Sequence, residues 1–114
     1  MLNDIGLVAN WWHKGQRYSE TLFFNFYPLR DCARISQEQW LSSQLFSHQV
    51  KLEGQVRQRL SEQGGWDDVE VEYEVCYGQA VHKTKMVYHR RIKCEGEFFG
   101  GLEAAKALLA KTGA

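Results

Sequence analysis

Apolar and polar residues alternate most regularly in the second half of the chain, between residues 69 and 94. The first run sets Val69, Val71, Tyr73, Val75 and Tyr77 against Glu70, Glu72, Glu74 and Cys76. A period of two is the spacing of a half-buried β-strand. After residues 78–81 the alternation resumes through residue 94, and its polar positions are now basic. We therefore expect a β-hairpin with one apolar face and one charged face.

The two charged rows of this hairpin are opposite in sign. If residues 78–81 form its loop, Glu74 faces Lys85 and Glu70 faces His89. Opposite charges facing each other across two strands contribute a few tenths of a kcal/mol to about 1 kcal/mol per pair. We therefore interpret the basic row as the partner of the acidic row.

An earlier hairpin is predicted in the first 27 residues. Residues 6–12 read as extended structure, and residues 13–17 read as a turn in which Gly15 supplies a positive φ. In the following run, 22–27, both the odd and the even positions are apolar except at Asn25, and Pro28 ends the run. A strand of this kind is expected to be covered on both faces, or to be central in the sheet with one face in an interface.

A long helix is predicted from Ser36 toward Gln63. Ser36 and Gln39 have the spacing of a capping box, and an apolar stripe follows at intervals of three and four residues: Leu41, Leu45, His48, Leu52, Val56 and Leu60. Because such a helix would be about 40 Å long at 1.5 Å per residue, we expect a break near Ser47 or Gly54. Phe46 and Val50 lie far round the helix from the stripe.

Residues 102–111 are nearly all good helix formers, so a short helix ends the chain. The predicted order is strand, strand, long helix, strand, strand, short helix. Residues 1–114 suffice for a single domain with one core. We predict an α+β fold in which two hairpins form an antiparallel sheet of about four strands, with both helices packed on one face.

Composition excludes several functional classes. Lys and Arg number 14 and Asp and Glu number 14, so no overall field attracts the chain to nucleic acids or anionic membranes. The four histidines have no metal-ligand spacing, and we expect neither a metal nor a cofactor. No run has the roughly 18 apolar residues of a membrane span, and the three cysteines fit a reducing compartment. We expect a soluble cytoplasmic protein that does not contact membranes.

Aromatic residues are abundant, with six Phe, five Tyr and four Trp. We hypothesise a non-catalytic binding protein that acts through an apolar and aromatic interface, most simply as a homodimer. The candidate interface residues are Phe23, Phe46 and Val50. A variant of this hypothesis is a small-ligand or protein-binding pocket between sheet and helices, lined by Trp11, Trp12, Tyr73 and Tyr88 with Arg90 as its anchor.

The basic strand supports an alternative function. A nucleic-acid-binding protein or small nuclease would use Lys83, Lys85, His89, Arg91 and Lys93 to contact phosphates. This hypothesis requires these side chains to stand free of the neighbouring glutamates.

Overall fold

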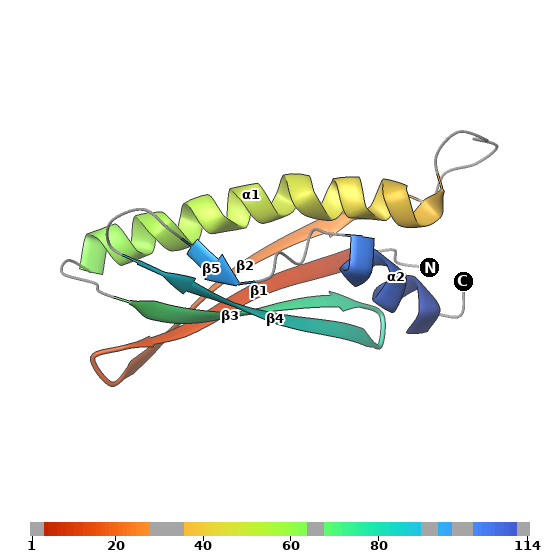
Figure 1. Cartoon of the computed structure of the whole chain (residues 1–114). Coiled ribbons are helices and arrows are strands. Elements are labelled where there is room, and N and C mark those ends of the chain that lie inside the picture. Colours follow the sequence, from red (N-terminus) through yellow and green to blue (C-terminus); the bar gives the residue numbers. More distant parts are fainter. Residues whose placement is uncertain (1–3, 28–35, 64–67, 90–93, 97–101, 112–114) are drawn as a thin grey trace.

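The computed structural model describes residues 4–27, 36–63, 68–89, 94–96 and 102–111. Its elements are β1 (Asp4–His13), β2 (Gln16–Asn25), α1 (Gln37–Gln63), β3 (Val69–Tyr77), β4 (Ala80–Tyr88), β5 (Cys94–Gly96) and α2 (Leu102–Lys111). The strands form an antiparallel sheet in the order β2-β1-β3-β4-β5, and both helices lie on one face of it (Figure 1). The predicted α+β class and order of elements are confirmed, and β5 adds a short fifth strand.

The first hairpin is regular along its whole length. Ten consecutive pairs join β1 to β2, from Asp4 opposite Asn25 to His13 opposite Gln16. The turn consists of Lys14 and Gly15, whose φ angles are 52° and 79°. Two positive φ angles in a two-residue loop define a type I′ turn, whose twist matches that of the flanking strands. The turn is therefore tighter than the five-residue turn expected from the sequence.

The second hairpin pairs β3 with β4, but its register differs from the expected one. Tyr77 faces Ala80, so the loop contains only Gly78 and Gln79. Gly78 has a φ of 61°, which suits the first position of a type II′ turn and allows a two-residue loop. Each partner consequently moves by two residues, and Glu74 faces Lys83. The predicted four-residue loop was wrong, whereas the pairing of acidic with basic rows was right.

The expectation that β4 continues through residue 94 was also wrong. β4 ends at Tyr88, and β5 pairs back on it with Cys94 opposite Tyr88 and Gly96 opposite Met86. A physical reason is visible in the sequence, because a strand continued in register would direct the charged Arg90 toward the apolar side of the sheet. Arg90 itself lies outside the described residues.

Among the described strands, β1 and β3 lie inside the sheet and β2 forms one of its edges. The prediction that residues 22–27 form a central or doubly covered strand was wrong. Leu22 and Phe24 point toward the helix layer and are half-buried, whereas Phe23 points the other way and is 71% exposed. The chain crosses from this edge to β3 through α1, a long-range connection that no local pattern specifies.

The core lies between the sheet and α1. The helix contributes five completely buried residues: Leu41, Leu45, Leu52, Val56 and Leu60. The sheet contributes alternate residues of its strands, including Leu7, Val71 and Met86. α1 runs unbroken over 27 residues, so the expected break near Ser47 or Gly54 is absent. The molecule accommodates this length because it is elongated, with a longest dimension of 50 Å.

The start of α1 is fixed by the predicted capping box. The Gln39 backbone N–H donates to Ser36 Oγ at 3.1 Å, and the Ser36 N–H donates to Gln39 Oε1 at 3.2 Å. Trp40 Nε1 donates to the Tyr27 carbonyl at 2.9 Å, which ties the first turn of the helix to the end of the first hairpin. α2 packs against α1 and β4 and buries Ala104, Ala105 and Leu108.

Replacing Ser36 with alanine removes the side-chain acceptor of the cap, so Ser36→Ala is expected to lower the free energy of unfolding by about 1 kcal/mol in urea denaturation. Ser47→Ala is the matched control, because Ser47 is exposed within the same helix and alanine favours helix there. An equal loss in both variants would contradict the capping role.

Candidate functional site

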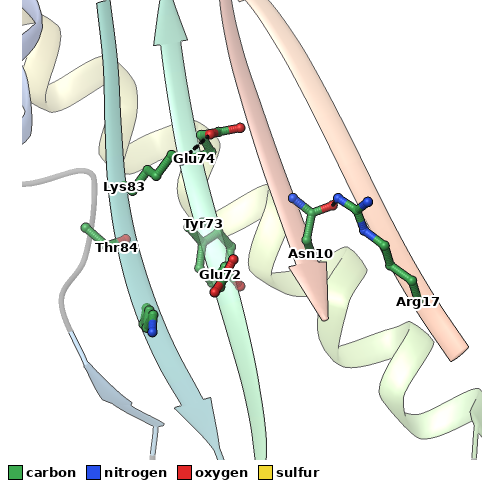
Figure 2. Close-up of a pocket in the computed structure, with 8 residues that line it drawn as sticks. Asn10, Arg17, Glu72, Tyr73, Glu74, Lys83 and Thr84 are labelled. Carbon is green, nitrogen blue, oxygen red and sulfur yellow. Dashed lines mark hydrogen bonds and ion pairs between the residues drawn. The ribbon is translucent and has the colours of Figure 1, made fainter. Parts of the chain in front are cut away.

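The sheet face opposite the helices is open, and its middle is occupied by paired charges. Lys83 Nζ lies 3.5 Å from Glu74 Oε1, and Lys85 Nζ lies 3.4 Å from Glu70 Oε1. A dashed line marks the Glu74–Lys83 pair in Figure 2. The Lys83 side chain is 75% exposed and that of Glu74 is 33% exposed, and the Lys85–Glu70 pair is also largely exposed to solvent. Each pair therefore contributes little to stability. Their effect is mainly to cancel charge locally across β3 and β4.

The remaining member of the basic row that the structure describes also has an acidic partner. His89 Nδ1 lies 2.5 Å from Asp68 Oδ1, instead of facing Glu70 as expected. Arg91 and Lys93 lie outside the described residues. Within the described part of the chain, the basic row is therefore paired with carboxylates and forms no bare cationic ridge of the kind that nucleic-acid binding requires.

A shallow hollow of about 400 Å³ lies beside these pairs on the open face. Both charge signs line it, and Figure 2 shows Arg17 of β2 reaching over to Asn10 of β1, where Nη2 donates to Oδ1 at 3.4 Å. Among the described residues, no group of three or more His, Cys, Asp or Glu side chains is placed to hold a metal ion. The hollow thus offers polar contacts of mixed sign without a dominant charge.

The four described members of the predicted pocket lie on two sides of the sheet. Trp11, Tyr73 and Tyr88 are almost fully buried in the core, whereas Trp12 is 66% exposed on the opposite side of β1. Adjacent residues of a strand point to opposite faces, so the two tryptophans are separated by the sheet itself. Arg90 lies outside the described residues.

The buried aromatic residues are held by specific contacts. Trp11 stacks on Tyr18 with ring centroids 5.9 Å apart, and Arg57 of α1 lies 5.1 Å from the centre of the Tyr88 ring. The Tyr73 and Tyr88 hydroxyls share a hydrogen bond. The Arg57 contact ties α1 to β4, the ring stack joins β1 to β2, and the shared hydrogen bond satisfies hydroxyl groups that burial removes from water.

The three predicted interface residues lie on two different surfaces. Phe23 projects from the open face of β2, and its ring lies over Gly6, where an added Cβ would be only 3.0 Å from a ring carbon. Phe46 and Val50 are 56% and 57% exposed and lie one turn apart on α1. Two further apolar side chains, Tyr27 and Leu102, are also exposed.

Cys76 belongs to the open face, opposite Gly6 and Val81 on the neighbouring strands. Burial raises the pKa of its thiol, Glu74 raises it further, and Lys83 acts in the opposite direction. Burial and the neighbouring carboxylate therefore disfavour the thiolate, and the residue acts as a small apolar side chain in this row.

The chain matches no protein family model, no curated protein and no solved structure. Among the described residues, no helix is both long and apolar enough to cross a membrane. Function is therefore inferred from the surfaces of the described residues: a charge-paired centre on the open face, exposed apolar residues on the sheet and on α1, and an edge at β2 that no other described strand covers.

Reversing one member of the Glu74–Lys83 pair tests the charge pairing. Lys83→Glu places like charges opposite each other and is expected to lower the free energy of unfolding by roughly 0.2–1 kcal/mol in urea denaturation at low salt. The double exchange Glu74→Lys with Lys83→Glu should recover most of this loss. In 1 M salt the difference should shrink, because screening acts on exposed pairs. An additive double variant would show that the two side chains do not interact.

The Cys76 environment predicts slow alkylation. Its iodoacetamide reaction, followed by peptide mass spectrometry, should show an apparent pKa above that of an exposed thiol. Glu74→Gln removes a negative charge and should lower this pKa, whereas Lys83→Gln should raise it further. A midpoint below the ordinary thiol value in the unmodified protein would contradict the described surroundings.

Proposed function

We propose that this chain is a non-catalytic interaction protein that works as a homodimer. The observation that carries the proposal is the number of large apolar side chains exposed in a small chain: Trp12, Phe23, Tyr27, Phe46, Val50 and Leu102. Single exposed apolar residues are ordinary on protein surfaces. Four of these side chains are aromatic rings between 56% and 71% exposed, and aromatic rings are the side chains most enriched at protein interfaces.

The electrostatics of the open face support association through apolar surface. Lys83 and Lys85 lie within 4 Å of glutamate oxygens, and the whole chain carries 14 basic and 14 acidic residues. No strong field therefore repels a second copy or attracts a phosphate backbone. Burial of apolar area contributes roughly 25 cal/mol per Å², which makes the exposed aromatic rings the largest available source of binding free energy.

The proposal includes a reducing location. Cys76 is a free thiol among the described residues, and free thiols persist in the cytoplasm because its redox buffers keep them reduced. We therefore infer that the protein is located in the cytoplasm.

Sedimentation velocity tests this proposal. The chain is expected to sediment as a dimer at micromolar concentration, and the dimer should persist at both 0.05 M and 0.5 M salt because apolar burial is insensitive to screening. A compact monomer at several hundred micromolar would contradict the proposal. Loss of the dimer in 0.5 M salt alone would contradict its apolar basis.

A further inference from the structure

One edge of the sheet is formed by β2, whose backbone can accept another strand. Among the described strands, only β1 pairs with β2. The two-residue turn makes His13 and Gln16 a hydrogen-bonded pair, so even-numbered residues of β2 direct their backbone groups toward β1. Odd-numbered residues, including Thr21, Phe23 and Asn25, consequently direct their N–H and C=O groups toward the free edge.

Residues 21–25 of this edge lack the features by which proteins commonly prevent strand addition. Residues 21–25 (Thr-Leu-Phe-Phe-Asn) contain no charge and no proline, and the register with β1 continues through them without a bulge. The opposite edge is different, because β5 is only three residues long. Long, regular and uncharged edge strands are the ones that pair with other chains.

The side chains of the same segment are apolar on both faces. Leu22 and Phe24 point toward the helix layer but remain half-buried, because no strand beyond β2 in the described structure completes their surroundings. Phe23 points to the open face and is 71% exposed. An added strand would cover apolar area on both sides of the sheet while forming backbone hydrogen bonds.

We propose that β2 pairs antiparallel with β2 of a second copy, with the two-fold axis at Phe23, so that one continuous sheet spans the dimer. In this register Leu22 faces Phe24 of the second copy, Thr21 faces Asn25, and the two Phe23 residues form a hydrogen-bonded pair. This inference rests on the proposed dimer and specifies which surface forms it.

Charge disfavours several of the alternative registers. In an antiparallel pair, two residues that lie opposite each other point to the same face of the sheet. In a pair of identical strands, the two-fold axis must therefore pass between one residue and the same residue of the second copy. An axis at Arg17 or Glu20 would oppose like charges, and an axis at Thr21 or Leu22 would set Glu20 against an apolar side chain. The axis at Phe23 pairs the whole uncharged segment 21–25 with itself, which is a longer overlap within β2 than an axis at Phe24 would give, and Glu20 can stay bound to Arg59 at 3.1 Å.

The first test uses exposed lysine substitutions followed by sedimentation velocity. Phe23→Lys places a charge at the axis and is expected to raise the dimer dissociation constant at least about tenfold. Val50→Lys is the comparison, because Val50 is similarly exposed on the separate apolar surface of α1, and edge pairing predicts that its substitution leaves the dimer intact. Circular dichroism verifies that both variants fold. Dissociation by Val50→Lys but not by Phe23→Lys would overturn the inference.

The second test uses disulfide formation in a background with Cys32, Cys76 and Cys94 replaced by serine. Cα atoms of a hydrogen-bonded antiparallel pair are about 5.5 Å apart, within the range that a disulfide spans. Phe23→Cys should therefore form a covalent dimer on oxidation. Ser19→Cys should not, because the two copies of residue 19 would be about 27 Å apart at 3.4 Å per residue.

The outcomes separate the two proposals. A monomeric wild-type chain contradicts both the dimer and the edge pairing. If the wild-type chain is a dimer but Phe23→Lys does not weaken it, the edge pairing is contradicted. The same holds if the Ser19→Cys variant forms the disulfide-linked dimer and the Phe23→Cys variant does not. In both cases the dimer must form through another surface.

Discussion

The fold depends on the fact that helices cover only one face of the sheet. The apolar stripe of α1, with Leu45 and Val56 completely buried, packs on alternate residues of the strands. The other residues of the same strands must therefore meet water directly. Across β3 and β4 they do so as acid–base pairs, such as Glu74 with Lys83. This arrangement keeps the middle of the open face hydrated and close to neutral in charge. The exposed apolar side chains lie at the rim of the sheet and on α1.

Local patterns predicted the elements well, because their causes are local. The alternation from Val69 to Tyr77 predicted β3, and the capping box at Ser36 predicted the start of α1. The register of the second hairpin depended on whether Gly78 adopts a positive φ, and the residues around it are compatible with loops of more than one length. Strand order depends on contacts between distant segments, so β2 was wrongly expected to be central. The end of β4 had a readable signal, since Arg90 interrupts the apolar parity.

The candidate sites were predictable to different degrees. Trp11 and Trp12 are adjacent in a strand, and alternation alone was sufficient to place them on opposite faces. The helical phase correctly separated Phe46 and Val50 from the buried stripe of α1. The role of β2 as an edge was not accessible, because neither composition nor periodicity records which strand has a neighbour. The interface roles of Phe23, Phe46 and Val50 remain predictions.

Residue-resolved amide hydrogen exchange tests the edge pairing most directly, because it reports on the backbone groups that would join the two copies. The Thr21, Phe23 and Asn25 amides point away from β1, and the account predicts that they are protected at high protein concentration and lose this protection on dilution. The Leu22 and Phe24 amides, which bond to β1, serve as internal references and stay protected. Rapid exchange of Thr21 and Phe23 in a sample that sediments as a dimer would contradict the account.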